Sequence, residues 1–136
     1  MIMSLPLPIV TVLQLLSLAF LAILFLQSGL DKVFNYKGNL DWLKSHFAKS
    51  PLKHTVTLLM PTITLLEVSA GVFSAIGCIQ LLLADNAFWG IVGAILSALS
   101  ILCLFFGQRM AQDYEGAGNL TGYFLICLAT LYFLTL

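Results

Sequence analysis

Four apolar stretches, each long enough to cross a lipid bilayer, take up most of the sequence. A membrane-spanning helix needs about 20 apolar residues, and we place the spans at residues 8–30, 58–83, 88–106 and 120–136. Hydrophobic residues make up 60% of the chain and charged residues 9%, a composition outside the range of soluble globular domains. The sequence therefore predicts an all-α membrane protein, in which a bundle of four transmembrane helices forms a single domain over residues 1–136.

The connection between the first two expected spans carries most of the charge. Residues 31–53 hold five of the six Lys and Arg residues of the chain. Asn39 is placed to cap a short helix there, and Pro51 suits the first turn of the long second helix. A short amphipathic helix that lies in the membrane interface is expected between the first two spans, because apolar residues recur at helical spacing at Leu40, Leu43 and Phe47.

The positions of the basic residues predict how the chain is oriented. Short loops that are rich in Lys and Arg are retained on the cytoplasmic side of the membrane. Residues 31–53 carry five of them, the connection at 107–119 carries Arg109, and residues 84–87 carry none. We therefore expect the Lys-rich connection to be cytoplasmic and both termini to face away from the cytoplasm, toward the periplasm if the membrane is a bacterial inner membrane.

Charge and hydropathy also limit the partners. The formal net charge is zero, which provides no electrostatic footprint for nucleic acid. The expected partners are membrane lipids and other membrane protein subunits, because almost no part of the chain lies outside the spans.

Small residues at spacings of three and four indicate where the helices pack. Such residues let membrane helices approach closely. The connection at 84–87 is short enough to force the second and third spans into an antiparallel hairpin, so we expect their small residues to face each other. The residues expected to serve helix packing, with one from the first span included, are Gly29, Gly71, Ser74, Gly77, Gly90 and Ala94.

One carboxylate, Glu67, lies in the middle of the second apolar run. A charge in lipid is costly unless it is paired, protonated or next to a wet cavity. The expected topology brings Lys32 and Arg109 to the same membrane face, and Arg109 is the stronger candidate because a guanidinium binds a carboxylate through two hydrogen bonds. We expect Glu67 to pair with one of them, next to Gln108 and Gln27, in a role that is structural first and a ligand site second.

The connection at 107–119 allows two interpretations. In the first it is a solvated loop, capped by Asn119 before the fourth span. In the second, Asp113 and Tyr114 fold back over the cytoplasmic mouth of the bundle and close the polar cluster there, with the tyrosine at headgroup level.

The chain offers few groups for catalysis or metal binding. Cys78, Cys103 and Cys127 lie singly in the last three spans with no CxxC motif, and we expect them to be small apolar fillers. His46 and His54 are expected to be solvated or to face headgroups. No nucleotide-binding or metalloprotease motif occurs. We expect no catalytic residue, no metal and no cofactor, with a quinone or lipid left open as a ligand.

Three segments together resemble the DoxX-like family of small four-helix membrane proteins, in the form found in Bacteroidota. They are FLQSGLDKVFNY, EVSAGVFSAIG and FFGQRMAQDYEGAGNLTGYF, and the resemblance covers nearly the whole chain. The resemblance implies a multi-pass bacterial membrane protein linked to larger redox-related assemblies. The sequence itself shows no motif for a redox centre. The positions that match the family pattern are Gly29, Lys32, Glu67, Gly71, Gly77, Gln108, Arg109, Asp113 and Tyr114.

Three functions remain open at this point. The leading hypothesis is a non-catalytic accessory or scaffold subunit of a larger inner-membrane or envelope complex. The second is a module that binds a quinone or a lipid headgroup. The third is a carrier or enzyme in which Glu67 exchanges protons.

The predicted orientation can be tested with single cysteines at Asp85 or Asn86. If both termini face away from the cytoplasm, this turn does so too, and a membrane-impermeant thiol reagent should label either cysteine from the non-cytoplasmic side. Labelling only from the cytoplasmic side would reverse the orientation.

Overall fold

Long apolar runs form helices in a membrane because lipid offers no hydrogen-bond partner to the backbone, so each peptide group must be satisfied within the protein. The computed structural model describes residues 7–136; what the domain and topology predictions say of residues 1–6 lies outside this range. The helices are α1 (Ile9–Phe34), α2 (Tyr36–His46), α3 (Val56–Ala84), α4 (Phe88–Met110), α5 (Tyr114–Asn119) and α6 (Thr121–Leu134).

Four of these helical stretches are long and apolar enough to cross a membrane: α1, α3, α4 and the continuous stretch of α5 and α6. The short helix α2 lies between the first two spans. The predicted fold class, a four-helix membrane bundle with a short helix after the first span, is confirmed. Several helices extend past the apolar runs used to place them, since a helical backbone continues into the polar headgroup region; α1, for example, runs on to Phe34.

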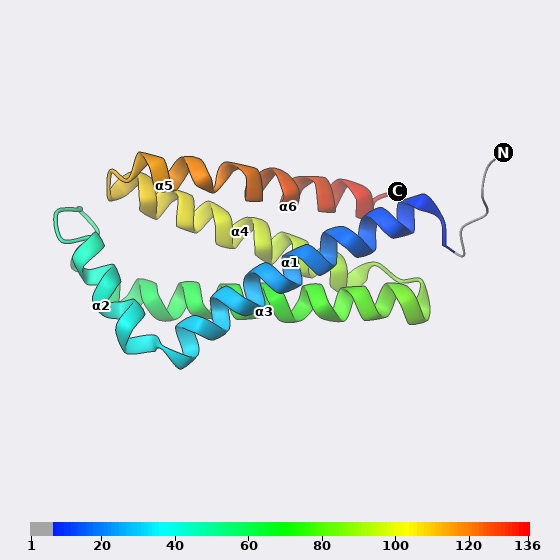
Figure 1. Ribbon diagram of the computed structural model, residues 1–136, viewed down its shortest axis with the longest axis horizontal. Helices are drawn as coiled ribbons and strands as arrows, with labels where there is room; N and C mark the ends of the chain where they lie inside the picture. Colours follow the sequence, from blue (N-terminus) through cyan, green and yellow to red (C-terminus); the bar gives the residue numbers. More distant parts are fainter. Residues whose placement is uncertain (1–6) are drawn as a thin grey trace.

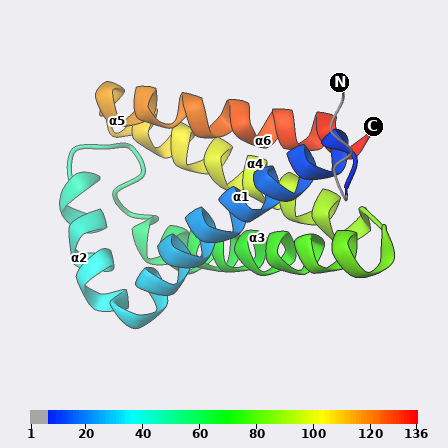
Figure 2. The ribbon, with the colours of Figure 1, turned by 45° about the vertical axis from the view of Figure 1, so that its right-hand side comes forward.

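The spans form a closed ring in which α1 packs on α3, α3 on α4, α4 on α6 and α6 on α1. Figures 1 and 2 show α1 running obliquely across α3. The start of α1 and the end of α6 lie at one end of the bundle, and α2 and α5 lie at the other (Figure 1). We call the second end the α2 end.

The start of α2 differs from the sequence prediction. Asn39 does not cap this helix, which begins three residues earlier at Tyr36. Its side-chain amide donates instead to the Asn35 carbonyl at 2.9 Å and to the Asp31 carboxylate at 3.2 Å. Asn39 thus holds the corner between α1 and α2, a role that depends on the chain folding back there.

The start of the long second helix was also predicted wrongly, because Pro51 does not lie in its first turn. The amide of Leu52 donates to the Ser50 hydroxyl at 3.1 Å, and the Lys53 amide donates to the Ser50 carbonyl. These short-range hydrogen bonds make turns over Pro51 and its neighbours in place of a first helical turn, and α3 begins only at Val56. From there α3 continues through Pro61 without a break.

The turn between α3 and α4 forms the expected antiparallel hairpin. Asp85 ends α3 in the left-handed conformation, with φ of 50°, which a short polar side chain tolerates better than most. Asn86 then accepts a hydrogen bond from the Phe88 amide at 2.9 Å and so satisfies a free donor at the start of α4. Gln80 accepts from the Trp89 amide at 3.0 Å, which adds a second tie across the turn.

Part of the predicted contact between α3 and α4 is present. A Cβ added to Gly77 would lie 2.6 Å from the Gly90 amide nitrogen, and one added to Gly93 would lie 2.5 Å from the Ser74 amide nitrogen. These glycines therefore let the two backbones touch, as small residues do in membrane bundles. Ala94 is fully buried beside them.

Gly71 does not face α4, contrary to the sequence prediction. A Cβ at this position would meet the Leu26 amide nitrogen of α1 at 2.6 Å. The prediction was wrong because α3 is packed on two sides, by α1 and by α4, and its small residues are divided between them. Gly29 of α1 lies in the same contact, where a Cβ would sit 2.9 Å from the Val68 amide nitrogen.

An apolar core and a polar contact between α1 and α6 both help to hold the bundle together. At the end opposite α2, the Gln14 amide of α1 donates to the Phe133 carbonyl of α6 at 2.7 Å. Every span contributes to a single apolar core, whose buried residues are Leu18, Leu21, Phe25, Ala70, Leu81, Ala94, Ile101, Cys127 and Leu134.

The contact of Gly77 with Gly90 yields a stability prediction. Gly77→Ala should lower the free energy of unfolding by about 1–3 kcal/mol, the usual cost of overpacking a filled interior. Gly122 is the matched control, because a Cβ on this exposed α6 residue meets nothing within 4 Å, so Gly122→Ala should be neutral or slightly stabilising. Thermal unfolding in detergent measures both, and equal midpoints for the two variants would contradict the close approach of α3 and α4.

Candidate functional site

A buried ion pair joins α1 to α3 near the α2 end. The Lys32 ammonium lies 2.8 Å from the Glu67 carboxylate, and only 1% of Glu67 is exposed. Ser28 donates to the same carboxylate oxygen at 3.0 Å and accepts from Lys32 at 3.0 Å. The three side chains therefore form a closed triangle, the Ser28–Lys32–Glu67 cluster.

Local sequence and helix packing together position this cluster. Ser28 and Lys32 are one helical turn apart, so both point from the same face of α1. The close contacts at Gly29 and Gly71 bring the α1 and α3 backbones together beside the cluster. Lys32 can therefore reach Glu67 directly, although its own side chain is still 18% exposed and keeps some contact with the surface.

The expected preference for Arg109 as the partner of Glu67 is wrong. Arg109 is exposed, and its guanidinium lies over the Tyr114 ring at 4.5 Å from the ring centroid. Its guanidinium therefore stacks on an aromatic face, while Glu67 is paired with Lys32. Lys32, the other predicted candidate, is the partner.

The other residues expected beside Glu67 lie elsewhere. Gln27 precedes Ser28 but is exposed, since consecutive residues point to different sides of a helix. Gln108 belongs to a second polar cluster on the other side of the bundle end. The residues predicted to form one polar cluster around Glu67 therefore lie in two separate places.

The second cluster joins α2, α4 and α5. His46 of α2 and Gln108 of α4 are hydrogen-bonded at 2.6 Å between Nε2 and Oε1, and the Asp113 carboxylate lies 3.6 Å from the same His46 nitrogen. Asp113 also caps α5, because its side chain accepts from the Gly116 amide at 2.9 Å. We call these residues the His46–Gln108–Asp113 cluster.

Aromatic contacts hold α2 in the same place. The His46 imidazole stacks on Trp42, with ring centroids 4.5 Å apart, and meets Phe47 edge-on at 5.5 Å. Phe47 is buried, and a Cβ added to Gly107 would lie 3.3 Å from its ring. The α2 helix is thus held to α4 by the Phe47 ring, which packs on Gly107, and by the hydrogen bond between His46 and Gln108.

The two interpretations of the connection at 107–119 are resolved in part. Residues 114–119 form α5, which Asp113 caps, and not a loop; Asn119 does not cap the fourth span, where α6 follows without a side-chain cap. Asp113 reaches back to His46, in agreement with the folded-back alternative, whereas Tyr114 remains 54% exposed beside Arg109.

Sequence reasoning missed Ser28 and His46. The spacing of Ser28 and Lys32 was a usable signal, because it places a hydroxyl on the lysine's face of α1. No comparable signal existed for His46, since its partner Gln108 is 62 residues away and the contact requires α2 to fold back onto α4. His46 was expected to be solvated or to face headgroups; its side chain is 18% exposed, so it is not fully solvated.

A groove lies between α2, α3 and α4, which we call the α2 groove. Its volume is about 600 Å³. The His46–Gln108 pair is at its polar end, and the rest of the lining is almost wholly apolar apart from Thr62. The lining residues are Trp42, Leu43, His46, Phe47, Leu52, Leu59, Thr62, Ile63, Leu66, Leu102, Cys103, Leu104, Phe106, Gly107 and Gln108.

The two polar clusters differ in what they can do chemically. The Ser28–Lys32–Glu67 cluster is closed on itself and does not line the α2 groove. The His46–Gln108–Asp113 cluster places a ring nitrogen and an amide at the end of an apolar groove. Within residues 7–136, no group of three His, Cys, Asp or Glu side chains is arranged to hold a metal ion, and the three cysteines are free thiols.

The ion pair predicts a clear difference between two charge-removal variants. Removing one partner of a buried pair costs about 3–5 kcal/mol, and because Lys32 is partly exposed we expect Glu67→Gln to fall near the lower end of that range. Arg109→Gln is the control, since loss of an exposed cation–π contact costs about 0.5–1 kcal/mol. The double variant Lys32→Met with Glu67→Met should recover part of the loss. Unfolding in detergent measures all three, and equal effects of Glu67→Gln and Arg109→Gln would contradict the pair.

The chain matches no protein-family model, no curated protein and no solved structure. The resemblance to the DoxX-like family therefore rests on the motif residues themselves.

Proposed function

We propose that the protein is a DoxX-like component of a bacterial inner membrane that serves as a non-catalytic accessory or scaffold subunit of a larger membrane complex. The observation that carries this proposal is the closed Ser28–Lys32–Glu67 cluster. Its carboxylate is 1% exposed and already bound by a cation and a hydroxyl. A group of this kind fixes one helix against another and offers no charge to a substrate.

The roles of the family-matching residues support the same proposal. Gly29, Lys32, Glu67 and Gly71 all lie in the contact of α1 with α3. Gly77 lies in the contact of α3 with α4. The remaining matches are at the α2 end: Gln108 and Asp113 contact His46, and Arg109 stacks on Tyr114. Family-matching residues that serve mainly in helix contacts are what we expect of a scaffold.

The arrangement of charge supports the proposed orientation. Four lysines lie between residues 36 and 55, against the single acidic residue Asp41. They belong to α2 and the connection that follows it, at the end opposite the start of α1 and the end of α6. Positive residues are retained in the cytoplasm, so we propose that the α2 end is cytoplasmic and that both termini are periplasmic.

A second candidate function is a module that binds a membrane amphiphile, either a quinone or a lipid through its headgroup. The α2 groove favours it, because about 600 Å³ of apolar space with polar groups at one end is within the range of sites that hold small molecules, about 300–1,000 Å³. A proton-exchanging role for Glu67 has no such observation in its favour, since the carboxylate is buried and paired.

One experiment separates the two candidate functions. The protein is tagged, expressed at native level and solubilised in a mild detergent, and everything that remains bound is identified by mass spectrometry. Specific membrane proteins in constant ratio, lost in a harsher detergent, are the expected result. The chain alone with a bound lipid or quinone would replace the first proposal with the second, and the chain with nothing bound would contradict both.

A further inference from the structure

The α2 groove opens sideways, toward the hydrocarbon of the bilayer. Leu102 and Phe106 on its α4 side are more than half exposed, and Trp42 on its α2 side is 56% exposed. In a spanning helix such side chains face lipid. The groove is therefore accessible to a molecule that is already dissolved in the membrane.

The apolar walls alone cannot select such a molecule. Lipid tails are as apolar as leucine side chains, so moving a hydrocarbon chain from the bilayer into the groove gains little. Selection has to come from the polar end, where the headgroup of the occupant lies. The chemistry at the α2 end therefore decides which molecule binds.

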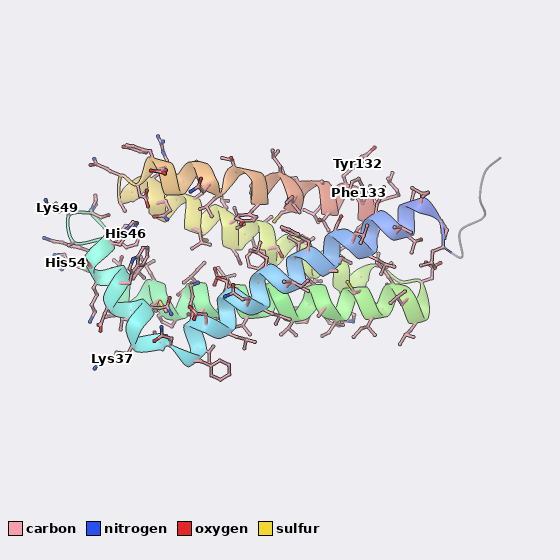
Figure 3. All side chains as sticks on the ribbon, viewed as in Figure 1. Lys37, His46, Lys49, His54, Tyr132 and Phe133 are labelled. Atoms are coloured by element: carbon pink, nitrogen blue, oxygen red, sulfur yellow. The ribbon has the colours of Figure 1, made fainter. Side chains whose placement is uncertain are left out.

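Three kinds of group gather at the polar end of the groove. His46 and Gln108 line it directly. Lys44 and Lys53 are exposed and belong to α2 and to the connection that follows it, at the same end of the bundle. Figure 3 places Lys49, His46 and His54 together at the α2 end. Positive charge at the headgroup level attracts anionic lipids.

The negative charge nearest to this end is already engaged. Asp113 faces His46 at 3.6 Å and caps α5 through the Gly116 amide. The Asp113 carboxylate is therefore held at the start of α5, where the helix dipole stabilises a negative charge. The lysines of the connection have no such partner among residues 7–136, where the only ion pairs are those of Lys32 with Glu67 and His46 with Asp113.

We propose that the α2 groove is a binding site for an anionic phospholipid. One acyl chain lies along the apolar walls, and the phosphate lies at the α2 end against His46, the Gln108 amide and the exposed lysines. This proposal deepens the second candidate function by naming the class of ligand, and it does not depend on whether the protein joins a complex.

The native thiol Cys103 reports occupancy of the site. It lines the groove and is exposed, whereas Cys127 is fully buried. The purified, delipidated protein is titrated with phosphatidylglycerol, phosphatidylcholine or decylubiquinone in detergent. Modification by N-ethylmaleimide is then followed on the peptide that contains Cys103. Phosphatidylglycerol should slow the modification severalfold, phosphatidylcholine should have little effect, and high salt should reduce the difference.

Two pairs of variants give matched controls, read by native mass spectrometry of the protein with phosphatidylglycerol. Cys103→Trp fills the groove and should abolish the retained lipid, whereas Leu99→Trp, one turn earlier on α4 and outside the groove, should keep it. Neutralising Lys44, Lys49 and Lys53 together with Gln should remove the preference for the anionic lipid, whereas Lys37→Gln at the start of α2 should not.

The outcomes separate the possible occupants. Equal retention of phosphatidylglycerol and phosphatidylcholine, or retention by Cys103→Trp, would overturn the proposal. Stronger protection by decylubiquinone would also overturn it and leave the quinone form of the second candidate function. Protection of Cys103 only in the presence of a co-purified protein would show that a partner helix occupies the groove instead.

Discussion

The ion pair of Lys32 with Glu67 is the contact on which the rest of the bundle depends. An unpaired charge inside a membrane costs several kcal/mol, so α1 must hold its lysine at one depth and one rotation against α3. Gly29 and Gly71 make this possible, because they let the two backbones approach to contact. The end of α1 is thereby fixed, and with it the point from which α2 departs after the single residue Asn35.

The position of α2 follows from weaker contacts at the α2 end of the bundle. Its hydrogen bond from His46 to Gln108 and the ring of Phe47 over Gly107 fasten it to α4. A hydrogen bond near headgroups competes with water and contributes less than one inside the span. The α2 helix is nevertheless what turns the lipid-facing side of α3 and α4 into a groove, because it supplies one wall and the polar end.

Much of the fold followed from the sequence, and the misses share one cause. The four spans, the short helix after the first span and the need of Glu67 for a partner were predictable from run lengths and from the cost of a lone charge. The choice of Arg109 over Lys32 and the assignment of Gly71 to α4 were wrong. Both depend on how each helix is rotated about its axis, and run lengths carry no information on rotation.

The run lengths are enough to predict a chain that crosses a membrane several times as helices, because apolar length and backbone hydrogen bonding leave no alternative. Which polar residues meet depends on how the helices pack. Ser28, Lys32 and Glu67 come together because α1 crosses α3 closely, and His46 meets Gln108 because α2 folds back onto α4. Such contacts join residues tens of positions apart, and packing of side chains over the whole bundle sets them.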